Sequence, residues 1–479
     1  MDPASASPTP EGRDRGGRGR RAGPLARLDR IPTWPYPRAL LWIIGAGYFF
    51  AFFDIVTISF ATPVIAQQFH VSKATVTLSV TSSLVGYIVG SLADSTIADK
   101  WGRKLSLAIS VAVFSLGTIL AAFSTDVTEL IIFRGIAGLG IGAEIAAVTT
   151  YLGELSPARL RGRYTSWATT AAYAGFAVVP FIARGLVPTL HDGWRILFWI
   201  GAAGGVTILF MRRGLPPSPR WLVAQGRGEE AAELVARAES TARERIEGEL
   251  PQPRPVPEEA RADGVPIRAL LRAPMLGRVA LFVGIWFIYY IGNYGWLTLA
   301  PTLFTDRGYS LASSTTYLLV SGIGFLVGAF ATTRFSDRFE RKYSIALFAL
   351  AWAGSLLVIG LAVSPTIIMV FGFLSSTTIG LMVPMLYTYT AEHFPTNARA
   401  TGVALSDGLG HVGGAIAPPV VLGAYAAWGF GGSFVVMAAS GVAAGALILL
   451  GIRATGRSLE TALAEGGNGS PGRASGAPA

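Results

Sequence analysis

Of the 479 residues in this chain, 51% are hydrophobic and only 14% are charged, and the mean hydropathy is +0.49. An ordinary soluble domain carries roughly 25% charged residues, so this composition predicts a membrane protein. The chain has no cysteine, which excludes disulfides, thiolate metal sites and cysteine nucleophiles. A net charge of +10 would suit a nucleic-acid partner, but the basic N-terminal segment directly precedes the first apolar run, where the positive-inside rule places it. We therefore expect no nucleic acid, no metal and no cofactor.

Residues 1–38 are rich in Arg, Gly, Pro and Ser, which predicts a disordered tail. The apolar runs that follow are long enough to cross a hydrocarbon core about 30 Å thick. They must be helices, because lipid offers the backbone no hydrogen-bond partners. The predicted helices are 39–66, 77–97, 105–123, 128–152, 166–187, 195–211, 278–304, 313–333, 343–363, 366–389, 402–427 and 432–452.

A polar segment at 212–276 divides the apolar runs into six and six. We therefore expect an all-α membrane protein with two six-helix bundles, at 39–211 and 277–452, and a disordered tail at 453–479. Lysine and arginine concentrate in the N-terminal tail, the central segment and alternate loops. The positive-inside rule then places both termini and the central loop in the cytoplasm, in a multi-pass protein of the cytoplasmic (plasma or inner) membrane.

Two loop segments recur with one offset, 238 residues, from 99 to 337 and from 151 to 389. The first, DKWGRK at 99–104, recurs as DRFERK at 337–342, and YLGELSP at 151–157 recurs as YTAEHFP at 389–395. Two copies of one design are therefore joined in tandem. A carboxylate at a helix end can pair with a neighbouring helix N-terminus or an arginine. We expect such a pair to hold the two halves of the protein shut until transport breaks it.

The first of these loops resembles the signature of the major facilitator superfamily, Gly-x-x-x-Asp-Arg/Lys-x-Gly-Arg-Arg/Lys, although Ser95 stands at its first glycine. The second copy departs further, with Thr333 and Glu340 at the glycine positions. Other segments resemble the sugar-porter branch and its metabolite-transporting relatives. They are Arg134 with Gly138, Gly140 and Gly142; Glu154 with Pro157, Arg161 and Gly162; PPSPRWL at 216–222; and GRSLE at 456–460.

This resemblance implies twelve helices in two pseudo-symmetric bundles that rock around a central cavity lined by helices 1, 4, 7 and 10. It does not imply a hexose substrate, because the glutamine pair that hexose porters show in helix 7 is absent from IWFIYYIGN at 285–293. The residues that the resemblance assigns to gating are Asp99, Gly102, Arg103, Lys104, Glu154, Arg161, Asp337, Arg341, Glu392 and Arg399.

Ionisable residues inside the apolar runs give the most specific functional signal, because each costs several kcal/mol unless it is paired or hydrated. Asp54 lies in helix 1 and Glu144 in helix 4, and both are candidates for proton coupling. The alternative is that each forms a structural pair with a nearby cation, for which Arg134 is the obvious choice. Asp407 and His411 lie one turn apart in helix 11, so they can touch. They are further proton-coupling candidates unless they are solvated near the cytoplasmic surface.

The candidate substrate contacts combine these charged groups with polar and aromatic residues of helices 7 and 10. The aromatic ones could instead serve in packing or in the interfacial belt. Arg134 and Glu144 have no counterpart in the second copy, where positions 372 and 382 are glycine and methionine. The full set is Asp54, Arg134, Glu144, Tyr289, Tyr290, Asn293, Trp296 and Tyr387.

We interpret the chain as a secondary transporter of a small polar metabolite, such as an organic acid or a sugar, that works by alternating access with proton symport. Its expected partners are the substrate, protons and the lipid bilayer, and we expect a monomer. Proton-driven efflux of hydrophobic compounds and uncoupled facilitation are the alternatives. The chain has no HExxH, GxSxG or Walker A motif, so we expect neither an enzyme nor an ATP-driven pump.

Overall fold

The computed structural model describes residues 23–253, 270–272, 275–335, 338–362, 364–394 and 398–453. The secondary structure within these ranges is helical. The first half contributes six long helices, which begin and end close to the predicted bounds. They are α2 (Arg38–Gln68), α3 (Lys73–Trp101), α4 (Arg103–Phe123), α5 (Val127–Leu155), α6 (Arg161–Leu186) and α7 (Gly193–Met211).

The second half contributes α11 (Met275–Asp306), α12 (Leu311–Phe335), α13 (Arg341–Leu361), α14 (Pro365–Glu392) and α15 (Arg399–Ile448). At ~1.5 Å per residue, the 50 residues of α15 would far exceed the thickness of a bilayer. The backbone is not helical at Gly429 (φ 67°, ψ −162°), so α15 is two helices joined at a sharp bend. The described chain therefore crosses the membrane region twelve times, as predicted.

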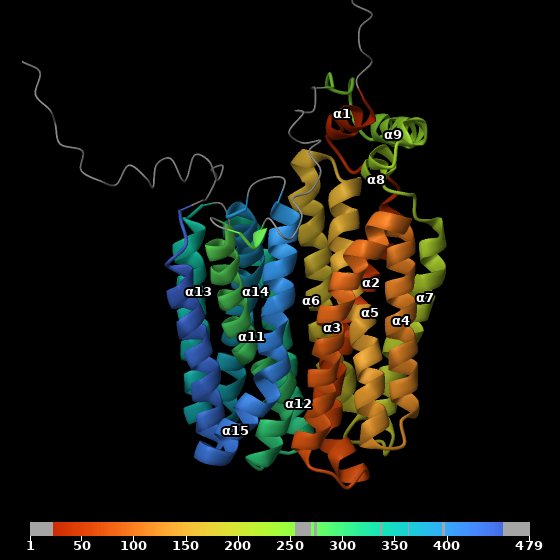
Figure 1. Cartoon of the computed structure of the whole chain (residues 1–479). Helices are drawn as coiled ribbons and strands as arrows, with labels where there is room; N and C mark the ends of the chain where they lie inside the picture. Colours follow the sequence, from red (N-terminus) through yellow and green to blue (C-terminus); the bar gives the residue numbers. More distant parts are fainter. Residues whose placement is uncertain are drawn as a thin grey trace, which may run out of the picture.

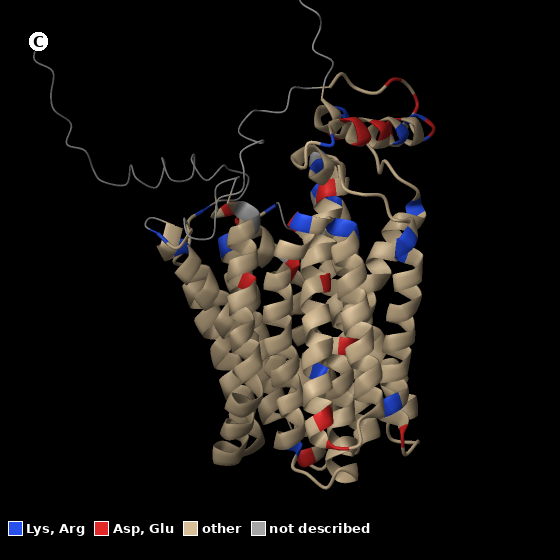
Figure 2. Ribbon diagram, turned by 45° about the vertical axis from the view of Figure 1, so that its right-hand side comes forward, with Lys and Arg blue, Asp and Glu red and all other residues tan. Residues whose placement is uncertain are grey.

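The two halves form two bundles that stand side by side (Figure 1). Charged residues gather at the two ends of the bundles, and the long body between them contains only a few (Figure 2). Within the first bundle, Gly138 and Gly142 lie so close to the backbone of α3 that any side chain there would collide with Ser83 or Tyr87. This is the role that small residues have between membrane helices, and it explains the presence of Gly138 and Gly142 in α5.

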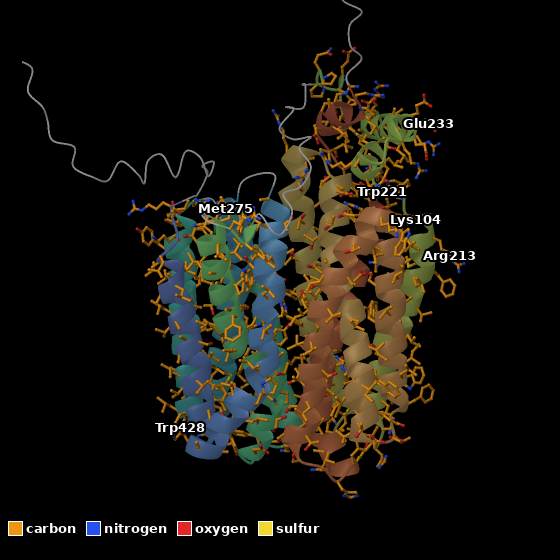
Figure 3. All side chains as sticks on the ribbon, viewed as in Figure 1. Lys104, Arg213, Trp221, Glu233, Met275 and Trp428 are labelled. Carbon is orange, nitrogen blue, oxygen red and sulfur yellow. The ribbon has the colours of Figure 1, made fainter. Side chains whose placement is uncertain are left out.

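A small cap sits over one end of the first bundle and consists of α1 (Pro24–Asp29), α8 (Pro219–Ala224) and α9 (Gly228–Arg243) (Figure 1). We call this end of the molecule the cap face and the opposite end the distal face. Lys104, Arg213 and Trp221 lie near the cap face, whereas Trp428 lies at the distal face (Figure 3).

The predicted disorder of residues 1–38 is wrong for residues 23–37. Trp34 and Leu28 are buried, and the side chains of Arg27 and Arg30 both donate to Glu239 of α9, at 2.6 and 2.8 Å. The prediction of disorder came from the high Arg, Gly, Pro and Ser content of residues 1–38 as a whole, which outweighed these few apolar residues. Residues 1–22 lie outside the described residues, and so does the predicted C-terminal tail at 453–479 apart from Arg453.

Candidate functional site

A buried ion pair joins α2 to α5 inside the first bundle. The guanidinium of Arg134 donates through Nη1 to Oδ2 of Asp54 at 2.6 Å, and the hydroxyl of Thr118 on α4 donates to Oδ1 at 2.9 Å. The side chains of Arg134 and Asp54 are each 1% exposed. Removing one partner of such a pair leaves an uncompensated charge, so the two groups depend strongly on each other.

Arg134 also lines a small cavity at the interface between the bundles. Tyr87 of α3 forms part of its wall, and Tyr294 and Thr298 of α11 contribute from the second bundle. The volume of ≈ 10 Å³ is room for about one water molecule. The Nε atom of Arg134 is buried and has no hydrogen-bond partner among the described residues. The arginine therefore keeps a free donor at a site to which both bundles contribute.

Glu144 does not share Arg134, which corrects the expected pairing of Glu144. Its carboxylate is bound by Arg212, whose Nη1 donates to Oε2 at 2.7 Å and whose Nη2 donates to Oε1. Ser110 also donates to Oε2, at 2.7 Å. Ten residues of helix separate Arg134 from Glu144, about 15 Å along the axis, which is beyond the reach of one side chain. The first bundle thus holds two separate buried ion pairs.

Asp407 and His411 lie in an aromatic enclosure at the bundle interface. Oδ1 of Asp407 accepts hydrogen bonds from Tyr290 at 2.5 Å and Tyr387 at 2.8 Å. The imidazole of His411 stacks on Tyr87 of the first bundle with a centroid separation of 4.0 Å. The His411 side chain is 4% exposed and that of Asp407 13%, so the solvated alternative does not hold in this structure. Tyr87 contacts both this enclosure and the cavity at Arg134.

Three other predicted substrate contacts lie within the second bundle. Tyr289 packs against Trp352 of α13, and Trp296 donates to Ser376 of α14 at 3.4 Å. Asn293 is 6% exposed, and its Oδ1 has no hydrogen-bond partner among the described residues. The structure therefore brings Tyr290 and Tyr387 together with Asp407, while Tyr289 and Trp296 take part in packing.

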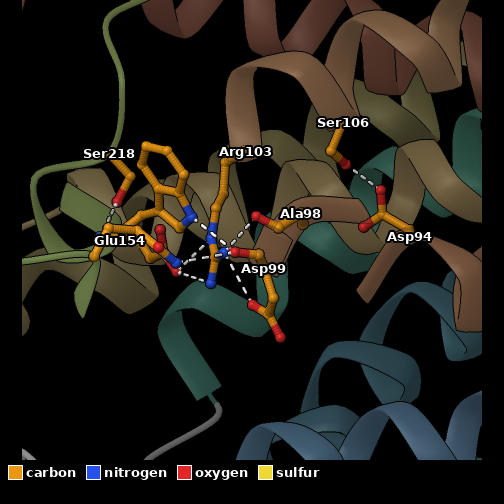
Figure 4. A network of polar contacts seen from close by, with 9 residues as sticks. Asp94, Ala98, Asp99, Arg103, Ser106, Glu154 and Ser218 are labelled. Atoms are coloured by element: carbon orange, nitrogen blue, oxygen red, sulfur yellow. Dashed lines mark hydrogen bonds and ion pairs between the residues drawn. The ribbon is translucent and has the colours of Figure 1, made fainter. Parts of the chain in front are cut away.

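The loop between α3 and α4 forms a polar network at the cap face (Figure 4). Arg103 pairs with Glu154 of α5 at 2.8 Å and with Asp99 at 2.9 Å. Gly102 adopts φ +94°, and the ring of Trp221 lies 3.2 Å from where a Cβ would stand. Trp221 also donates to the carbonyl of Asp99 at 3.0 Å. The expected pairing of this loop is therefore present. The expectation that it holds the two halves shut is wrong for this structure, because Arg103, Asp99 and Glu154 all lie in the first bundle.

The remaining gating candidates lie partly in the first sequence repeat and partly in the second. Lys104 donates to the carbonyl of Arg213 at 2.8 Å, and Arg161 lies at the exposed start of α6. Arg341 pairs with Glu392, which repeats the Arg103–Glu154 pair at the same 51-residue spacing. Asp337 lies outside the described residues, as does the side chain of Arg399.

Sequence reasoning missed three residues that complete these sites. Arg212 lies directly after the end of α7, so the sequence groups it with the polar central segment. The signal that could have found it is Glu144, because a carboxylate inside helix 4 needs a cation as its partner. Thr118 and Tyr87 were missed because a threonine or a tyrosine in an apolar run carries no distinctive pattern. No cluster of metal-ligating side chains occurs among the residues that the structure describes.

Comparison with known proteins settles the family. The sequence profile described as "Major Facilitator Superfamily" matches residues 44–418 and 318–474. The chain belongs to this superfamily. The niacin transporter NiaP of Acinetobacter baylyi is 30% identical over 440 residues, which cover 91% of this chain and 99% of that protein. The 4-hydroxybenzoate transporter PcaK of the same organism is 29% identical over 385 residues, which cover 78% and 82%.

Solved structures show the same fold. The proton:xylose symporter XylE bound to 6-bromo-6-deoxy-D-glucose superposes with a TM-score of 0.70 at 21% identity, covering 91% of this chain and 99% of XylE. The inward open conformation of XylE from E. coli also gives a TM-score of 0.70, at 18% identity, covering 90% and 100%. This member of the superfamily is therefore a multi-pass membrane transporter of a small molecule and not an enzyme.

Proposed function

We propose that this superfamily member imports a small organic acid together with protons, by alternating access of the central site to the two faces of the membrane. The observation that carries the proposal is the buried Asp54–Arg134 pair beside the interface cavity. A carboxylate and a guanidinium at one buried site supply a proton acceptor and an anion-binding group within contact distance of each other. In a low-dielectric site, the state of each group controls the other.

The coupling step follows from competition for Arg134. While Asp54 is ionised, it neutralises the arginine, and a substrate anion would have to displace it. Protonation of Asp54 removes that competitor and leaves Arg134 as a buried cation, which a substrate carboxylate would stabilise. The loaded site then carries the proton on Asp54 and the anion on Arg134. The loaded site has the same net charge as the empty ion pair. This favours alternation of the site either with both the proton and the substrate anion bound or with neither bound.

Two features favour an aromatic carboxylate as the substrate. The relatives NiaP and PcaK are named for niacin and 4-hydroxybenzoate, each of which is an aromatic ring with one carboxylate. In this chain, the wall of the cavity beside Arg134 includes Tyr87 and Tyr294, and aromatic rings pack well on such side chains. A sugar would instead depend on hydrogen bonds, for which Asn293 offers a buried, unused acceptor.

The charge distribution favours a cytoplasmic cap face, because the basic residues gather there. Asp407 and His411 form a second titratable pair beside the cavity, and we keep them as proton-coupling candidates. The chain is proposed to act as a monomer in the cytoplasmic membrane.

The test is uptake by purified protein reconstituted in liposomes. An imposed inward proton gradient should drive protein-dependent accumulation of labelled nicotinate, benzoate or 4-hydroxybenzoate but not of xylose, and a protonophore should abolish it. Net flux that is indifferent to the protonophore would indicate a facilitator. Gradient-driven loss of a hydrophobic dye, without accumulation of any acid, would indicate an exporter, and either result would refute the proposal.

A further inference from the structure

We propose that Lys73, Thr305 and Asp306 form a latch that holds the two bundles together at the distal face and must open in every transport cycle. Lys73 is the first residue of α3 in the first bundle, and Asp306 is the last residue of α11 in the second. The ammonium of Lys73 pairs with the carboxylate of Asp306 and donates to Thr305 at 3.1 Å. We call these three residues the distal latch.

The distal latch is the end of a longer line of contacts between α3 and the second bundle. Eight residues along α3, Thr81 donates to the carbonyl of Ala415 at 2.8 Å. Six residues further, Tyr87 stacks on His411. At ~1.5 Å per residue, these contacts extend over about 21 Å of helix. Separation of the bundles at the distal face must therefore break the latch first and the His411 stack last.

The other end of α3 presents a different surface. The side chain of Asp99 is 74% exposed and pairs only with Arg103 of its own loop among the ion pairs of the described residues. Trp101 is 54% exposed. The helix is thus engaged with the second bundle from its distal end to its middle, and exposed at the cap face. This structure is closed at the distal face.

Lys73 also forms part of the wall of a hollow of ≈ 570 Å³ at the distal face. The first bundle contributes residues near His191 to its wall, and the second contributes Tyr309 and Leu311. Thr305 of the latch lines the hollow as well. Opening the latch would connect it to the interface that leads inward to Arg134, which makes Lys73 a gating residue of the entry path.

The latch should be weak enough to open. The side chains of Lys73 and Asp306 are 28% and 26% exposed, and ion pairs with such access to water shift an equilibrium by only about 1.5- to 5-fold. Neutralising either partner should raise the population of the distally open state by that factor. The inference rests on the proposed alternating access, but not on proton coupling or on the identity of the substrate.

The experiment uses the natural absence of cysteine. Spin labels at His191→Cys and Ala312→Cys, both exposed and on opposite bundles, report the distance across the distal hollow in nanodiscs. Lys73→Met and Asp306→Asn should each increase the long-distance population about 1.5- to 5-fold, and Lys73→Asp combined with Asp306→Lys should restore much of the original distribution. The matched control is Arg307→Met, which removes the neighbouring cation that stacks on Phe430 of its own bundle.

Distance distributions identical to those of the labelled parent in both single variants would overturn the proposal. An equal shift in the Arg307→Met control would do the same, because it would show a general effect of charge. Failure of the charge exchange to restore the distribution, with the fold intact by melting temperature, would show that the pair itself is not the latch. Uptake without proton coupling would refute the proposed symport and leave the latch standing.

Discussion

Replacing Arg212 with methionine is expected to destabilise the first bundle by about 3–5 kcal/mol, because the carboxylate of Glu144 is then buried without a counter-charge. The side chains of these two residues are 1% and 0% exposed, so water cannot substitute for the guanidinium. Such a loss corresponds to about two to four orders of magnitude in the folding equilibrium constant.

The double variant Arg212→Met with Glu144→Gln is expected to be more stable than Arg212→Met alone. It leaves no unpaired charge at this site, and glutamine retains an acceptor for the hydroxyl of Ser110. The remaining cost is that of a few lost hydrogen bonds, about 1 kcal/mol each. Arg213→Met is the matched control. Its side chain is exposed and lies on Phe210, so it should change stability by less than about 0.5 kcal/mol.

The assay is equilibrium unfolding of the purified variants in mild detergent, followed by loss of helical circular dichroism. The reasoning would be refuted if the double variant were as unstable as the sum of the two single variants. It would also be refuted if Arg212→Met matched the Arg213→Met control.

Three further predictions concern residues outside the two buried ion pairs. Gly102→Ala should cost about 1–3 kcal/mol of unfolding free energy, because φ is positive there and the new methyl group meets the Trp221 ring; a melting temperature equal to wild type would contradict this. Burial lowers the pKa of His393 from 6.5 to about 4. The fold is therefore most stable above pH 6.5, where the ring is neutral, and at most about 3 kcal/mol of unfolding free energy is lost as the pH falls to 4. His393→Gln, which retains an acceptor for the Ile452 amide, should flatten the dependence of unfolding free energy on pH between 4 and 6.5. Burial raises the pKa of Glu239, but hydrogen bonds from Arg27 and Arg30 outweigh this effect and lower the net pKa. Glu239→Gln should therefore speed tryptic cleavage within residues 23–37, and an unchanged rate would show that these bonds do not hold the segment.

The helices were predictable because each depends on a strong local signal. An apolar run in lipid has no alternative to the helix, and the predicted bounds differ from those of α2 to α14 by only a few residues. The repeat was also readable, since the spacing of Arg103 and Glu154 recurs in Arg341 and Glu392. In the structure, both spacings become ion pairs.

The pairing inside the bundles was not predictable, because it depends on which helices are neighbours. The sequence contains Asp54, Arg134, Glu144 and Arg212, but only the packing of α2, α4, α5 and α7 assigns each acid to its own cation. The docking of residues 23–37 was hidden for a similar reason. Its apolar residues are few, and they are buried by packing on α9 and α6, which only the fold brings together.

The most direct test of proton coupling is to separate exchange from accumulation in Asp54→Asn. In liposomes, exchange of labelled for unlabelled substrate needs binding and alternation but no net proton movement. The variant should still exchange, because Arg134 remains available to the substrate, and its intact fold is checked by melting temperature. It should lose accumulation driven by a pH gradient, whereas Asp94→Asn, which alters a buried acid bonded to Ser106 away from the cavity, should retain both. Accumulation in Asp54→Asn at the wild-type level would contradict the assignment of Asp54 as the proton carrier.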